Sequence, residues 1–162
     1  MNQRRRQWMT AGVAVGALAA GAGAAWWRFA PSEVMTGAEE AFWNSSFEGP
    51  SGEGVNLAAW RGQPLLVNFW ATWCPPCVHE LPLLNAFHAS HAPKGWQVLG
   101  LAVDQPSAVR AFMRKLPLAF PVGMAGLAGT ELSRSLGNLT GGLPFTVVFD
   151  ATGRVAHRKI GQ

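Results

Sequence analysis

Cys74 and Cys77 are the two cysteines of this 162-residue chain, and they lie three positions apart within the stretch NFWATWCPPCVHELP, residues 68–82. Two thiols at this spacing can form a small structural staple, contribute to a metal site, attach a haem group or act as a redox pair. The neighbouring residues and the elements on either side of the pair decide between these four kinds of chemistry.

Three of the four interpretations find little support in the sequence. A staple that closes so short a loop stabilises a fold by only about 2 kcal/mol. A zinc site needs about four ligands, but there is no second cysteine pair, and helical spacing turns His79, His88 and His91 onto different faces. Haem attachment needs a histidine directly after the second cysteine, where Val78 stands. We therefore expect no metal and no cofactor, and the redox pair is the favoured interpretation.

The redox interpretation has a physical basis in the expected backbone. Residues 64–71 form a continuous apolar run that is typical of a buried strand, and helical sequence follows from Pro75 to about His91. Cys74 then lies at the helix start, where unpaired N–H groups and the helix dipole lower the pKa of a thiol. Cys77 lies one turn further along the helix. We expect Cys74 to attack a partner's disulfide and Cys77 to resolve the mixed disulfide.

Strands and helices alternate along the rest of the chain. The expected strands are residues 42–47, 55–57, 64–71, 96–104, 145–150 and 154–160, and the expected helices are residues 75–91, 107–115 with Ser107 as the N-cap, and 130–136. The last two strands are joined as a hairpin by a turn at residues 151–153. This order predicts an α/β fold with a central mixed β-sheet flanked by helices.

Residues 1–30 have the pattern of an export segment. Three arginines, residues 4–6, precede 21 uncharged residues from Gln7 to Trp27 that are rich in alanine and glycine. This pattern is that of a signal peptide or a transmembrane anchor, and a length that suffices to span a bilayer favours the anchor. The arginines should stay in the cytoplasm. We therefore expect the domain in the periplasm, anchored to the inner membrane, with residues 31–41 as a linker.

The positive charge of the chain belongs to this leader. The formal net charge is +4, but the first 25 residues hold three of the 13 basic residues and no acidic one. The remainder therefore has ten basic against nine acidic residues, without a basic stripe. A nearly neutral domain of this kind predicts no nucleic-acid partner.

The stretch NFWATWCPPCVHELP resembles the thioredoxin superfamily, and most closely the exported, often membrane-anchored thiol-disulfide oxidoreductases of the TlpA/ResA type. A second stretch, GGLPFTVVFD at residues 141–150, resembles the segment that carries the cis-proline of that family. The resemblance implies a thioredoxin-like domain over residues 42–162. It also implies that Pro144 packs against the disulfide, that the backbone of Leu143 pairs with a bound client, and that Trp73 belongs to the same client-binding surface.

Two positions in this resemblance bear on proton transfer. Asn68 stands where cytoplasmic thioredoxins carry a buried aspartate, whereas Glu80 fills the position of a glutamate found in the TlpA/ResA group. Cys77 and Glu80 are three residues apart and share a helix face, so we expect Glu80 to accept the Cys77 proton. Phe145 stands where the family often has threonine, and the acidic residue typical of dedicated cytochrome c maturation members is absent. The resemblance therefore leaves the client open.

These features lead to one favoured function and one alternative. The favoured function is a thiol-disulfide oxidoreductase that reduces disulfide-bearing client proteins, in cytochrome c maturation or related redox homeostasis, and receives electrons from a membrane electron donor. The alternative is a thiol-based metallochaperone that holds Cu(I) between Cys74 and Cys77. The family normally continues beyond the position of Gln162 into a helix that covers one sheet face, so we expect the sequence to be truncated there.

Overall fold

The computed structural model of this chain describes residues 37–162. The predicted export segment, residues 1–30, and the first part of the predicted linker lie outside the described residues. Within residues 37–162, every helix falls short of the length and apolarity that crossing a bilayer requires.

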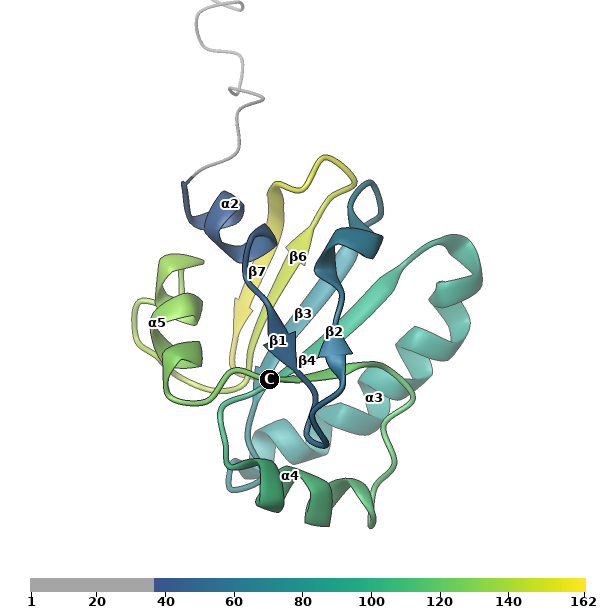
Figure 1. The fold of residues 1–162 in the computed structure, drawn as a ribbon, viewed down its shortest axis with the longest axis vertical. Coiled ribbons are helices and arrows are strands. Elements are labelled where there is room, and N and C mark those ends of the chain that lie inside the picture. The colour runs from purple at the N-terminus through teal and green to yellow at the C-terminus, as the bar shows by residue number, and fades with distance from the viewer. Residues whose placement is uncertain (1–36) are drawn as a thin grey trace, which may run out of the picture. The chain divides into compact units, whose positions relative to one another are not determined.

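In the described part of the chain, seven strands form one mixed sheet in the order β2-β1-β5-β4-β3-β6-β7 (Figure 1). The strands are β1 (Phe47–Glu48), β2 (Gly54–Val55), β3 (Leu65–Trp70), β4 (Gln97–Ala102), β5 (Val122–Met124), β6 (Phe145–Phe149) and β7 (Val155–Ile160). β4 is parallel to both β3 and β5, whereas β6 is antiparallel to β3 and to β7. The mixed sheet expected from the sequence is therefore confirmed.

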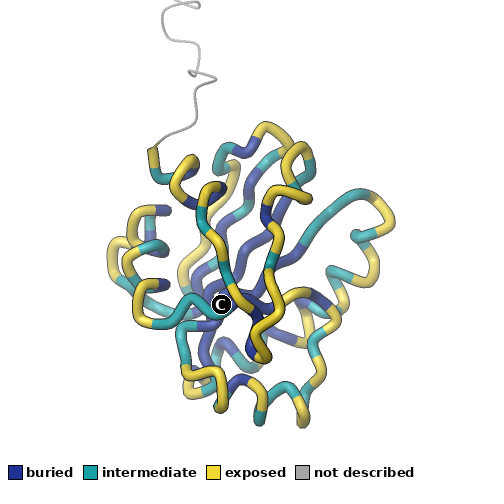
Figure 2. Tube along the Cα trace, viewed as in Figure 1, coloured by how far each residue is buried: buried dark blue, intermediate teal, exposed yellow. Residues whose placement is uncertain are grey.

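Helices cover both faces of this sheet. They are α2 (Gly37–Trp43), α3 (Pro75–His91), α4 (Pro106–Met113) and α5 (Ala128–Ser135), with short 3-10 turns at Leu57–Trp60 and Ala92–Lys94. Leu65, Val67 and Phe69 of β3 lie in the core on the side of α2 and α5. Leu66 and Trp70 point to the other face, where α3 and α4 pack. Figure 2 shows the central strands as the most continuously buried part of the chain, so they form a rigid base for the site.

The predicted strand at residues 42–47 is wrong over its first part, because Phe42 and Trp43 end helix α2. Adjacent aromatic residues are typical of strands, but both of these pack on Phe149 of β6. The ring centroids of Phe42 and Phe149 are 4.5 Å apart, and Trp43 Nε1 donates to the Gly153 carbonyl at 2.9 Å. Tertiary contacts thus stabilise a seven-residue helix whose first residues lie within the predicted linker.

Two smaller differences concern the chain after β4. The N-cap of α4 is Gln105, and Ser107, the predicted cap, lies inside the helix behind Pro106. No strand is predicted at β5, because three residues are too few for an alternating pattern to be recognised. The other main elements, β3, α3, β4, α5, β6 and β7, lie within about two residues of their predicted bounds.

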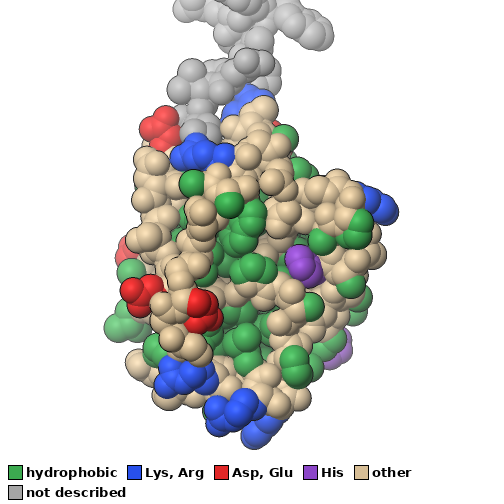
Figure 3. Space-filling model, turned by 45° about the vertical axis from the view of Figure 1, so that its right-hand side comes forward, with side chains coloured by type: hydrophobic (Ala, Val, Ile, Leu, Met, Phe, Trp, Pro, Cys, Tyr) green, Lys and Arg blue, Asp and Glu red, His purple; other side chains and the backbone are tan. Residues whose placement is uncertain are grey.

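Basic side chains are unevenly distributed over the displayed surface. Figure 3 shows Lys and Arg side chains near the upper end, at the lower end and at the upper right edge of one face, with hydrophobic side chains in its middle. The lower end is the one at which α4 lies in Figure 1. Arg110 of α4 donates from Nη1 to the Pro50 carbonyl at 2.5 Å, so this arginine also fastens α4 to the loop between β1 and β2.

Candidate active site

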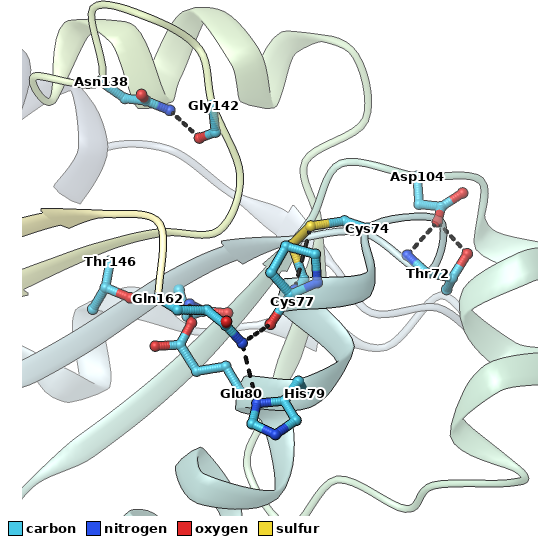
Figure 4. The surroundings of a disulfide bond; sticks show 12 residues. Thr72, Cys74, Cys77, His79, Glu80, Asp104, Asn138, Gly142, Thr146 and Gln162 are labelled. Atoms are coloured by element: carbon cyan, nitrogen blue, oxygen red, sulfur yellow. Dashed lines mark hydrogen bonds between the residues drawn. A yellow bond between two sulfur atoms is a disulfide. The ribbon is translucent and has the colours of Figure 1, made fainter.

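Cys74 and Cys77 lie where β3 leads into α3, which is the position predicted from the sequence (Figure 4). Cys74 is the N-cap of α3, and its Sγ atom accepts a hydrogen bond from the Cys77 amide at 3.3 Å. The two sulfur atoms form a disulfide with an S–S distance of 2.04 Å. The described state is therefore the oxidised one.

The two cysteines differ in their access to solvent. Cys77 is 0% exposed, whereas Cys74 is 5% exposed and follows Trp73, which is 65% exposed. Pro75 and Pro76 occupy the first turn of α3, where the absent N–H groups of proline cost no helical hydrogen bond. Cys74 thus lies at the helix N-terminus and keeps a small exposed fraction, whereas Cys77 has none, and a position at a helix N-terminus favours a reactive thiolate.

Thr72, two positions before Cys74, is held by Asp104, a residue that was not among the predicted site residues. The amide and the hydroxyl of Thr72 donate to Asp104 Oδ2 at 2.8 and 2.6 Å (Figure 4). Asp104 follows β4, which pairs in parallel with β3. The sequence contained a signal for this contact, because two buried strands separated by a helix are expected to pair in parallel and to end at the same sheet edge.

The loop before β6 lies against the same cluster of buried side chains as the two cysteines, through Leu143. The Leu143–Pro144 peptide bond is cis, as the resemblance implied, and Pro144 is buried. Asn138 holds the loop, because its Nδ2 atom donates to the Gly142 carbonyl at 2.9 Å (Figure 4). Among the backbone–backbone hydrogen bonds of the turns and loops within residues 37–162, none uses the amide or the carbonyl of Leu143.

An apolar groove begins beside Trp73, the neighbour of Cys74. Its volume is about 460 Å³, and its apolar lining includes Val103, Leu127 and Leu143. Leu127 is 90% exposed, so the lining of the groove presents an apolar side chain to solvent. Exposed apolar surface next to a reactive group is typical of a binding site for an apolar segment of a partner.

Glu80 lies one helical turn beyond Cys77 and is half-buried. Asn68 Nδ2 donates to Glu80 Oε2 at 3.5 Å and to Thr146 Oγ1 at 3.0 Å. Burial raises the pKa of Glu80, although the charge of Lys159 and the hydrogen bond from Asn68 act in the opposite direction. A cavity of about 230 Å³ lined by Glu80 and Lys159 opens at this point. The carboxyl group can therefore exchange protons closer to neutral pH than an ordinary glutamate.

The sequence of this chain is similar to known redox proteins over most of its length. The Redoxin family model matches residues 38–162. Thiol-disulfide oxidoreductase ResA of Bacillus cereus strain ZK / E33L is 31% identical over 137 residues, which are 83% of this chain and 75% of the relative. The ResA protein of Bacillus anthracis matches with the same identity and the same coverage.

Solved structures give the same result for the fold. A thiol:disulfide interchange protein of the thioredoxin family from Chlorobium tepidum TLS has a TM-score of 0.63 and 33% identity, covering 72% of this chain and 82% of its own. A thioredoxin-related protein from Neisseria meningitidis serogroup B has a TM-score of 0.61 and 26% identity, covering 70% of this chain and 84% of its own. The thioredoxin-like fold that the sequence resemblance implied is therefore confirmed.

Proposed function

Since this chain belongs to the redoxin family and is a thiol-disulfide oxidoreductase of the TlpA/ResA type, we propose that it reduces disulfides in client proteins. The domain works in the periplasm, anchored to the inner membrane by its N-terminal segment. Its clients belong to cytochrome c maturation or to related redox homeostasis. One observation carries the proposal: at the start of α3, one sulfur lies at the helix N-terminus and the other is fully buried.

In the first step, the Cys74 thiolate attacks one sulfur of a client disulfide. A bond forms between Cys74 Sγ and that sulfur, and the other client sulfur leaves with the bonding electron pair and takes a proton from water. The Cys77 amide, 3.3 Å from Cys74 Sγ in the oxidised form, stabilises the attacking thiolate. The backbone of Leu143 and the groove beside Trp73 hold the client while the bond forms.

In the second step, Cys77 releases the client. Its thiol gives a proton to Glu80, and its sulfur attacks Cys74 Sγ, so that the Cys74–Cys77 bond forms and the mixed disulfide breaks. The second client sulfur leaves as a thiolate and is protonated in turn. The client has then gained two electrons and two protons, and the protein is in its disulfide form. A dithiol of the membrane electron donor reverses the same exchange and restores both thiols.

A turnover assay tests this proposal. The full-length chain in detergent micelles should accelerate the reduction of insulin by dithiothreitol, and the double variant Cys74→Ser/Cys77→Ser should leave the reaction at its uncatalysed rate. The reduced chain is also titrated with Cu(I), because a metallochaperone would hold copper between its two sulfur atoms without catalysing exchange. Tight copper binding without any acceleration of insulin reduction would overturn the proposal.

A further inference from the structure

Asp104 ties the end of β4 to the residues that precede Cys74. Its Oδ2 atom accepts hydrogen bonds from the Thr72 amide at 2.8 Å and from the Thr72 hydroxyl at 2.6 Å. Its Oδ1 atom accepts a hydrogen bond from the Gln105 amide at 2.7 Å. Both carboxylate oxygens are therefore engaged, and two of these three donor groups belong to a residue two positions before the nucleophile.

The parallel pairing of β3 and β4 accounts for this contact. Trp70 lies opposite Ala102, and the Val103 amide donates to the Trp70 carbonyl at 2.8 Å. The segments that follow β3 and β4 therefore continue side by side beyond the end of the sheet. Thr72 and Asp104 each lie two residues past that last pair, so the register of two buried strands brings the carboxylate to the threonine.

The carboxylate of Asp104 is a strong acceptor at neutral pH. Burial acts to raise the pKa of Asp104, but the hydrogen bonds from Thr72 and Gln105 outweigh it, so the pKa lies below its ordinary value. The group is therefore ionised across the neutral range, and hydrogen bonds to an ionised acceptor are stronger than those between neutral groups. This gives Thr72 a firm attachment to the end of β4.

The segment that Asp104 holds determines where the Cys74 sulfur lies. Thr72 and Trp73 connect the buried strand β3 with α3, and the Trp73 side chain is largely exposed. The Cys74 amide makes only a long hydrogen bond, 3.3 Å, to the Ala71 carbonyl. A small displacement of Thr72 would therefore move the Cys74 sulfur relative to the Cys77 amide.

We propose that Asp104 is a positioning residue for Cys74, because it fixes Thr72 and thereby keeps the Cys74 sulfur at the first N–H groups of α3. This inference rests on the proposed function, in which Cys74 is the attacking thiol. This positioning role differs from a direct electrostatic effect of the Asp104 carboxylate, because a negative charge near a thiol disfavours the thiolate. Removing the charge should therefore slow Cys74 if the carboxylate positions it, and should speed Cys74 if the carboxylate acts only through its charge.

The chain provides a matched control in the turn between β6 and β7, at the opposite end of β6 from Pro144. There Asp150 Oδ1 accepts hydrogen bonds from the Thr152 amide at 2.8 Å, from the Thr152 hydroxyl, and from the Arg154 amide at 3.2 Å. Asp150→Asn repeats the chemical change of Asp104→Asn in a similar aspartate–threonine arrangement outside the site. It separates a loss of reactivity from a general loss of stability.

The experiment measures the alkylation rate of Cys74 against pH in the reduced full-length chain. Thr72→Val removes the hydroxyl donor and keeps the Asp104 charge, whereas Thr72→Ser keeps both. We expect Thr72→Val and Asp104→Asn to react roughly three- to tenfold more slowly than the wild type at pH 7, with a higher apparent pKa of Cys74. Thr72→Ser and Asp150→Asn should react at about the wild-type rate.

A wild-type rate in Thr72→Val, or an unchanged or faster rate in Asp104→Asn, would overturn the inference. If Asp104→Asn loses its near-ultraviolet circular dichroism, the two Thr72 variants decide the question without it. The alkylation rate needs no client protein. A wild-type chain that fails to reduce insulin would therefore count against the proposed function and would leave the outcome for Asp104 intact.

Discussion

The Cys77→Ser variant should accumulate as a mixed disulfide with its substrate, whereas Cys74→Ser should form none. Cys74 lies at the N-terminus of α3, and Cys77 is fully buried one turn later. Only Cys74 therefore meets a client disulfide, and only Cys77 is placed to release it. We expect catalytic turnover to fall to the uncatalysed rate in both variants, but for opposite reasons. The two variants are treated with a fluorescent glutathione disulfide, and non-reducing gel electrophoresis then shows which variant retains the label.

The control for this experiment is the variant that lacks both cysteines, which should retain no label. Mass spectrometry should locate the glutathione of Cys77→Ser on Cys74, and one equivalent of dithiothreitol should remove it. Label retained by Cys74→Ser to the same extent would contradict the assignment, because it would mean that the buried sulfur also reaches the client.

Glu80→Gln should slow the release of the client by about tenfold or more near neutral pH, since a positioned general base commonly contributes a factor of about 100 or more. Glutamine keeps the size and the helix propensity of the side chain and removes the proton acceptor. Asn68 cannot accept the Cys77 proton in its place. Single-turnover release of a model disulfide, measured between about pH 6 and 9, tests the prediction.

The stability of Glu80→Gln should be equal to that of the wild type or slightly higher at neutral pH. Burial raises the pKa of Glu80 in the folded state, so the folded protein binds the proton more tightly than the unfolded chain does. The free energy of unfolding therefore decreases as pH rises through the window between the two pKa values, and the ionised carboxylate remains unfavourable above it. Glutamine removes this cost.

The matched control for this prediction is Glu40→Gln, on an exposed position of α2. It should change neither the release rate nor the melting temperature. If Glu80→Gln releases a model disulfide at the wild-type rate over the whole pH range, Glu80 is only a surface carboxylate. The proton of Cys77 would then have to leave through water.

The strand, turn and helix around the cysteines could be predicted from the sequence because every local signal there agrees. The apolar run at residues 64–71 became β3 (Leu65–Trp70), and two prolines after Cys74 begin α3 at the predicted residue. Each of these signals acts within a few residues of the chain, so no distant contact was needed to interpret it. The position of the predicted nucleophile at the helix start follows from the same agreement.

Helix α2 could not be predicted in this way, because contacts far along the chain decide it. Phe42 stacks on Phe149, and Glu39 accepts a hydrogen bond from the Val155 amide at 2.6 Å. Seven residues are too few to form a stable helix alone. The local aromatic pattern therefore favoured a strand, and the contacts with the β6–β7 hairpin favoured a helix.

The surroundings of Glu80 depended on strand register, which the sequence did not specify. Asn68 of β3 lies opposite Thr146 of β6 in an antiparallel pair, and this pairing brings Thr146 to the amide that also contacts Glu80. Asp104 reaches Thr72 through the parallel register of β3 and β4 in the same way. The sequence indicated the sheet edge that Thr72 and Asp104 share, but the register that joins these two residues, and the neighbours of Glu80, required the alignment of the strands.

The proposed mechanism assigns different reactivities to Cys74 and Cys77, so the alkylation rates of the two thiols are its decisive measurement. The reduced full-length chain is treated with short pulses of iodoacetamide between about pH 5 and 9, and the labelled sulfur is located by peptide fragmentation. We predict that Cys74 is labelled first at every pH, with an apparent pKa below the ordinary value of about 8.5 for a free cysteine. Equal alkylation rates for both thiols would show that Cys74 and Cys77 do not have the separate attacking and resolving roles assigned to them.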